Sequence, residues 1–310
     1  DAQRRESFIL LLEPSICHKT FACPLVAVDQ LLERLNFADS LERDRLFNGI
    51  KSHLDSLPNR YLIKKLLPMV ILSLELQSDS IAGLNLIFYL SPKLEKETFE
   101  CDIAPFIVKL FEKTDRAIRL LLLDNIKLIV DTFPEKIIQN SIFGHFCAGF
   151  ADSLAELREA TLKASVVLLP KLTARQISND LVRHYSRLQS DEQPGIRVNA
   201  LICLGKISDK LEPTVKLKTF MAAISRALQD PFPPARHSGL LLLSSMIESF
   251  PSDILAKNFL PVISPMLLDK DLEVKAKAFA TIREILQHLE SKNPVQCQAK
   301  AIMESADVGK

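Results

Sequence analysis

A period of 39 residues runs through most of the sequence, and it restricts the fold more than any other feature. An arginine recurs at this interval ahead of a run of apolar residues, with a lysine in the fifth copy: Arg119, Arg158, Arg197, Arg236 and Lys275. Six residues before the last four of these stand aspartates, namely Asp152, Asp191, Asp230 and Asp269, whereas the first copy has Lys113. A fixed period of about 20–50 residues is the sequence signature of a solenoid.

Each period has the pattern of two helices. From Leu154 to Leu169, leucines and valines recur at spacings of three and four residues, with charged residues between them, and Leu260 to Leu289 repeats this pattern. Such spacing places apolar side chains along one stripe of a helix. No segment alternates with a period of two, so strands are not expected. The predicted fold is all-α: a right-handed α-α superhelix, a HEAT- or armadillo-type solenoid, with about six to seven antiparallel helix pairs.

The two charged columns predict a structural ladder between repeats. Asp230 lies in the turn after a first helix, where its carboxylate can accept backbone N–H groups from the start of the second helix. Arg236 begins that second helix, and stacking brings each arginine near an aspartate of its own or of the neighbouring turn. Bidentate pairing of arginine with carboxylate suits such a partly buried position. Because an active site is usually unique, recurrence at every period argues against catalytic carboxylates.

The period also predicts the organisation of the chain. Residues 1–28 look irregular and are interpreted as a linker or a remnant of a preceding domain, and 29–292 as the solenoid. An opening helix pair and a divergent repeat are followed by five regular repeats at about 101–136, 137–173, 174–212, 213–252 and 253–292. Residues 293–310 are polar and are expected to form a flexible tail.

Composition narrows the functional classes. The 39 basic and 38 acidic residues nearly cancel, which argues against a dedicated nucleic-acid binder, although a local basic patch stays open. No apolar run approaches the roughly 18–20 residues that span a bilayer, so membrane insertion is not expected. The six cysteines have no framework spacing, and we interpret them as buried free thiols in a reducing compartment.

Catalytic motifs are absent from the sequence, so we expect neither an enzyme nor a cofactor. Glycine-rich phosphate loops, a GxSxG elbow and kinase signatures do not occur. Cys17, His18 and Cys23 come closest to a metal cluster, but their spacing fits no zinc motif, so no metal site is predicted. His184 and Tyr185 fall inside a first helix, where packing explains them better than acid–base chemistry.

A surface on the second helices is the candidate for partner binding. Its positions are counted from the arginines that recur every 39 residues. It includes Lys163, Lys206, Ile202, Leu241 and His237. Two interpretations remain open for these positions. Burial against neighbouring helices is the simpler one, and a partner groove on the inner face of the solenoid is the functional one.

Several segments closely resemble the HEAT region of the Scy-like pseudokinases, also called N-terminal kinase-like proteins. The resemblance spans about 29–292 and is most specific over 180–243. It is carried by TDRAIRLLLLDNI (114–126), LREATLKASVVLLPKL (157–172), DLVRHYSRLQSDEQPGIRVNALICLGKI (180–207), SRALQDPFPPARHSGLLLL (225–243) and LPVISPMLLDKDLEVKAKAFATI (260–282).

The resemblance implies a non-catalytic scaffold. Family members carry an inactive kinase domain before the repeats and a variable tail after them, and neither is expected in this chain. The family implies protein partners in vesicle traffic, coatomer or clathrin adaptors, and a cytoplasmic location peripheral to Golgi or endosomal membranes. A tRNA-export factor that binds tRNA or transport receptors is the alternative. Near-neutral charge and few aromatic residues rank it second.

Overall fold

The computed structural model describes residues 23–35, 37–76 and 80–292, and within these ranges the chain forms helices and turns without a strand. The predicted tail at 293–310 and most of the segment at 1–28, including Cys17 and His18, lie outside the described residues. Within the latter segment, a helix already begins at Pro24.

Contacts divide the chain into two compact units that meet in sequence between Leu110 and Phe111. The longer helices of unit 1 are α2 (Pro24–Leu35), α3 (Ser40–Lys51), α5 (Leu67–Leu76) and α6 (Ile81–Leu90), and α8 (Ala104–Glu112) contains the division. Among these, α3 packs on α2 and on α6.

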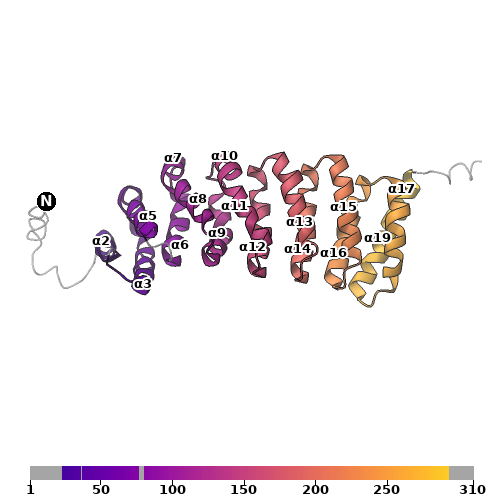
Figure 1. The fold of residues 1–310 in the computed structure, drawn as a ribbon, viewed down its shortest axis with the longest axis horizontal. Helices are drawn as coiled ribbons and strands as arrows, with labels where there is room; N and C mark the ends of the chain where they lie inside the picture. Colours follow the sequence, from indigo (N-terminus) through magenta and orange to yellow (C-terminus); the bar gives the residue numbers. More distant parts are fainter. Residues whose placement is uncertain (1–22, 36, 77–79, 293–310) are drawn as a thin grey trace, which may run out of the picture. The chain divides into compact units, whose positions relative to one another are not determined.

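Unit 2 consists of helix pairs that follow one another in chain order (Figure 1). The second helices are α9 (Arg116–Ile129), α12 (Ala155–Leu168), α14 (Pro194–Ile207), α16 (Pro233–Met246) and α19 (Leu272–Lys292). The first helices contain α11 (Phe143–Ala148), α13 (Val182–Leu188), α15 (Pro213–Leu228) and α18 (Leu260–Ile263). Each second helix packs on the next one, and α13 and α15 pack on the second helices of their own repeats. This is the predicted all-α, HEAT- or armadillo-type solenoid.

Small residues let the two helices of a repeat approach closely. Gly239 on α16 faces Ala227 on α15, and a Cβ added at Gly239 would lie 3.0 Å from the Ala227 Cβ. Gly149 faces Thr161 in the same relation, and an added Cβ would overlap the threonine hydroxyl at 2.2 Å. The glycine lies on the first helix at Gly149 and on the second helix at Gly239. In both repeats the absent side chain lets the two helices pack closely.

Most first helices contain a π-helical segment, which the sequence analysis did not foresee. In each, two buried apolar residues lie four positions apart, and the five pairs are Leu62/Leu66, Phe99/Ile103, Ile138/Ile142, Ile177/Leu181 and Leu255/Phe259. Single π-helical turns inside α-helices are rare. The exception in unit 2 is α15, which is α-helical from Pro213 to Leu228.

The cysteines depart in part from the expected burial. Cys203 is buried and donates to the Leu162 carbonyl at 3.7 Å, and burial raises the pKa of its thiol to about 11. Cys23 and Cys101 are exposed. Cys23 directly precedes α2, and Cys101 lies within the π-helical segment Phe99–Ile103, so the prediction of buried thiols is wrong for these two.

Candidate partner-binding surface on the second helices

Three arginines of unit 2 each form a bidentate ion pair with an aspartate of the following repeat. Arg158 binds Asp191, and its Nε and Nη2 atoms lie 2.7 and 2.8 Å from the two carboxylate oxygens. The Arg197–Asp230 and Arg236–Asp269 pairs have the same geometry, with all four distances between 2.7 and 2.8 Å. The aspartate side chains are 6–10% exposed and the arginine side chains 14–17%. We call these three pairs the Arg–Asp row.

The backbone of each turn completes the row. Oδ1 of Asp230 accepts the N–H of Phe232 at 2.8 Å, which shapes the turn before α16. The carbonyl of the same Asp230 accepts Nη1 of Arg236 at 2.9 Å. Asp191 makes the equivalent contacts with Gln193 and Arg197. Asp191 and Asp230 therefore each bind the preceding repeat through the side chain and the arginine of their own repeat through the backbone carbonyl, so the three pairs form one continuous chain of hydrogen bonds.

The row keeps its carboxyl groups ionised. Burial disfavours the charged form of Asp191 and of Asp230, but hydrogen bonds from the arginine and from the turn N–H outweigh it, and the pKa of both carboxyls is lowered. For Asp269, the hydrogen bond from Arg236 is the largest influence and lowers the pKa. Buried carboxylates that are paired and hydrogen-bonded in this way avoid the usual penalty of burial.

The two ends of the predicted ladder differ from its middle. Asp152 forms its ion pair with Arg116, at 3.1 Å, instead of with Arg119. Arg119 donates from Nε to the Lys113 carbonyl at 2.8 Å, so it keeps only the contact with its own turn. Lys275, at the other end, has no ion pair among the described residues, although its charge lowers the pKa of Asp269.

The predicted partner-binding residues lie on three consecutive second helices. Lys163 is exposed on α12 and pairs with Glu159 at 2.7 Å. Ile202 on α14 and Leu241 on α16 are 45% and 47% exposed. Lys206 is exposed, and His237 is half-buried on α16, four residues before Leu241.

Three of these residues meet in one groove between α14 and α16. Ile202, Lys206 and Leu241 line it, and the groove has a volume of about 340 Å³. Gly205 forms part of its floor, and an added Cβ there would lie 3.2 Å from Leu242. Lys163 and His237 do not line it. We call this feature the α14–α16 groove. It offers an apolar surface with one cation at its edge, an arrangement suited to binding rather than to covalent chemistry.

Polar contacts between second helices flank the groove, and the sequence analysis missed them. On one side, Asn199 donates to Glu159 across α14 and α12 at 3.2 Å. On the other side, Lys277 donates to Ser244 at 2.8 Å, and Ser244 donates to Glu284. Lys277 and Ser244 lie 33 residues apart, as do the pairs of the Arg–Asp row, and the other two pairs lie 40 residues apart, close to the 39-residue period. The period was therefore the available signal.

The histidine and tyrosine that stood out in the sequence have packing roles. The Tyr185 hydroxyl is fully buried and shares a hydrogen bond of 2.7 Å with Ser165. His184 stacks on Phe150 with ring centroids 4.8 Å apart, and burial, followed by Arg183, lowers its pKa. Within the described residues, no group of three potential metal ligands comes together, and no helix is long and apolar enough to cross a bilayer.

No protein-family model matches the chain. Among curated proteins, it is 29% identical over 259 residues to the probable inactive serine/threonine-protein kinase scy1 of Dictyostelium discoideum, covering 84% of this chain and 32% of that protein. It is 30% identical over 216 residues to cytoplasmic export protein 1 of Saccharomyces cerevisiae, covering 69% and 28%.

The chain therefore spans about a third of the length of these relatives. The crystal structure of Cex1p superposes with a TM-score of 0.76 and 26% identity, over 88% of this chain and 54% of that one. The sequence similarity and the structural similarity thus point to the same group of proteins. The chain is a HEAT-repeat homologue of the Scy1-like pseudokinase proteins.

Proposed function

We propose that this chain is a non-catalytic scaffold that binds an apolar segment of a protein partner in the α14–α16 groove. The observation that carries the proposal is the exposure of Ile202 and Leu241 side by side in one groove, with Lys206 at its edge. Exposed aliphatic residues on neighbouring helices are a common feature of protein-binding sites. The name of the Dictyostelium relative, a probable inactive kinase, supports a role without catalysis.

The partners that we propose are coat components, of the coatomer or clathrin-adaptor type. On this proposal the protein acts in the cytoplasm, at the surface of Golgi or endosomal membranes, and contributes a rigid frame. The Arg–Asp row supplies that rigidity, because it fixes the spacing between α14 and α16 on which the groove depends. A frame held by buried bidentate pairs presents its binding residues at little entropic cost.

Proximity labelling in cells tests this proposal. The chain would be compared with an Ile202→Glu/Leu241→Glu variant, which places two carboxylates in the groove. Leu128→Glu is the matched control, because Leu128 is 49% exposed on α9 and lies outside the groove. We expect labelling of coat components to disappear with the double variant and to persist with the control. Labelling that is equal for all three proteins would refute the groove.

Nuclear export of tRNA is the second candidate function. It is favoured by the similarity to a relative named cytoplasmic export protein 1. The net charge of +1 ranks it lower, because tRNA binding draws mainly on basic surface. Binding of tRNA by the purified chain that weakens steeply with added salt would reverse this ranking, and so would labelling dominated by tRNA-export factors.

A further inference from the structure

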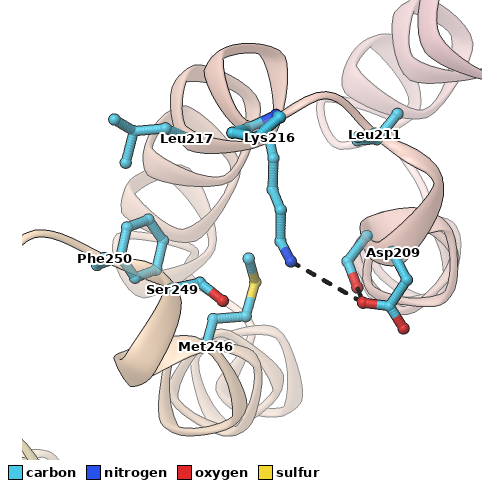
Figure 2. A pocket seen from close by; sticks show the side chains of 9 residues that line it. Asp209, Leu211, Lys216, Leu217, Met246, Ser249 and Phe250 are labelled. Carbon is cyan, nitrogen blue, oxygen red and sulfur yellow. Dashed lines mark hydrogen bonds and ion pairs between the residues drawn. The ribbon is translucent and has the colours of Figure 1, made fainter.

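A cavity of about 370 Å³ lies at the end of unit 2's second helices that is opposite the Arg–Asp row. It forms where the turn after α14, the start of α15 and the end of α16 meet. Figure 2 shows Lys216 reaching across it from α15 towards Asp209, with Met246 and Phe250 on the facing side. The cavity shares no lining residue with the α14–α16 groove.

Lys216 occupies a position that the repeat otherwise fills with an aliphatic core residue. Ile177 stands one period before it and Leu255 one period after it, and both are buried, at 3% and 0% exposure. The side chain of Lys216 is 22% exposed. Its helix α15 is also the one in unit 2 that lacks the π-helical segment. At the start of α15, a lysine and a cavity thus replace the packed aliphatic side chain of the neighbouring repeats.

The partner of Lys216 within the chain is weak. Nζ lies 3.9 Å from Oδ1 of Asp209, at the outer limit of an ion pair, and the Asp209 side chain is 96% exposed. Ser208 donates to the same carboxylate at 3.2 Å. An exposed ion pair of this length contributes little stabilisation, so an incoming anion can readily replace Asp209 as the partner of Lys216. The ammonium group carries three N–H donors and can bind a carboxylate at close range.

Apolar groups form the other wall of the cavity. Met246 and Phe250 are 5% and 4% exposed and face the lysine, with Leu217 beside them. A ligand that satisfies this site carries a carboxylate and an apolar group within the reach of one residue. We propose that the cavity binds the C-terminal residue of a partner protein, with its terminal carboxylate on Lys216 and its apolar side chain against Met246 and Phe250.

The choice of a chain terminus follows because the Lys216 ammonium group and the apolar wall of Met246 and Phe250 line the same small cavity. A terminal leucine or phenylalanine bears the carboxylate and the apolar side chain on one Cα atom. An internal glutamate brings the charge but leaves the Met246 and Phe250 wall uncovered. The volume of about 370 Å³ lies at the lower end of the range for ligand pockets and has room for one large residue.

Methyl NMR of the full chain tests the proposal, with Met246 as a reporter inside the cavity. Protein labelled with ¹³C in its methionine methyl groups is titrated with N-acetyl-leucine, with neutral N-acetyl-leucinamide and with the α-amide of N-acetyl-glutamic acid. We expect a saturable shift of the Met246 methyl with N-acetyl-leucine and at least about tenfold weaker binding of the amide, since a charge-assisted hydrogen bond is lost. Equal binding of the glutamate derivative would overturn the terminal assignment, and no response to any probe would overturn the site.

Variants of the two charged residues separate the site from nonspecific effects. Lys216→Leu restores the residue type of the neighbouring repeats, so it should fold and lose the response. Asp209→Asn removes the competing carboxylate and should tighten binding. Lys218→Leu is the control, because Lys218 is exposed on the same helix outside the cavity, and it should change nothing. Binding that survives Lys216→Leu would contradict the proposal. The groove variant Ile202→Glu/Leu241→Glu should respond like the unaltered chain, so this test is independent of the proposed function.

Discussion

Acid–base contacts join consecutive helix pairs in both units, but their chemistry differs. In unit 1, Asp55 accepts from Tyr89 at 2.7 Å and from Lys93 at 3.0 Å, and its side chain is 83% exposed. In unit 2, Asp230 is almost buried and binds both Nε and Nη2 of Arg197. Exposed single contacts contribute little to stability, whereas a buried pair leaves a costly orphan when one partner is removed. Similar sequence separations therefore hide different energetic roles.

The largest effect is expected from Arg197→Ala. This change leaves Asp230 buried without its bidentate partner, and it also frees the Asp191 carbonyl. We expect the free energy of unfolding to fall by about 1–3 kcal/mol, measured by urea denaturation. Lys93→Ala in unit 1 is the control and should cause a much smaller loss. Equal losses for the two variants would erase the distinction between the units.

The end of the row offers a comparison within unit 2. Arg119 is one of the arginines that recur every 39 residues, but its side chain binds only a backbone carbonyl, whereas Arg158 binds a buried carboxylate. Arg119→Ala should therefore destabilise by about 0.5–1.5 kcal/mol, less than Arg158→Ala. Thermal or urea unfolding of the two variants under one condition gives the answer. A larger loss of stability in Arg119→Ala would mean that the position in the repeat contributes more to stability than the ion pair does.

Acid should weaken unit 2 through the row. The pKa of Asp191, Asp230 and Asp269 is lowered in the folded state, below the value of about 3.9 of an unfolded aspartate. The stabilisation is thus complete above about pH 4 and is lost as the pH falls through the folded values, because the unfolded state then binds more protons. Urea midpoints between pH 6 and pH 3 should fall more steeply for the unaltered chain than for Asp230→Asn. Parallel curves would contradict this.

The smallest effect is expected from filling the cavity at Lys216. Lys216→Leu places an aliphatic side chain where Ile177 and Leu255 stand in the neighbouring repeats. Burial of additional apolar surface should raise the thermal midpoint by about 2–4 °C, as a gain near 1 kcal/mol does in a unit of this size. Calorimetry measures it. A lowered midpoint would show that the lysine has a packing role that its place in the cavity does not reveal.

Periodicity was sufficient to predict the helix pairs, because a solenoid repeats its sequence wherever it repeats its packing. It also placed Arg158, Arg197 and Arg236 next to turns that carry aspartates. It did not decide between the aspartate of the same turn and that of the next one, because that choice depends on how far one repeat is displaced from another. Nor did it predict that Asp152 pairs with Arg116, while Arg119 donates to the Lys113 carbonyl.

The candidate surface was harder to predict than the frame. For Ile202 and Leu241 the sequence favoured burial as the simpler interpretation, and the structure shows both side chains exposed. The Lys216 cavity had a signal in the sequence, a lysine in a column of aliphatic residues. The meaning of that signal required the α-helical course of α15 and the position of Asp209.

A double-mutant cycle on Arg197 and Asp230 tests most directly whether buried pairs join the repeats. The free energies of unfolding of Arg197→Ala, Asp230→Ala and the double variant give the coupling energy between the two side chains. We expect a coupling above about 1 kcal/mol, and a value near zero for the same cycle on Arg119 and Asp152, which do not pair. A negligible coupling between Arg197 and Asp230, or equal couplings in the two cycles, would contradict the account.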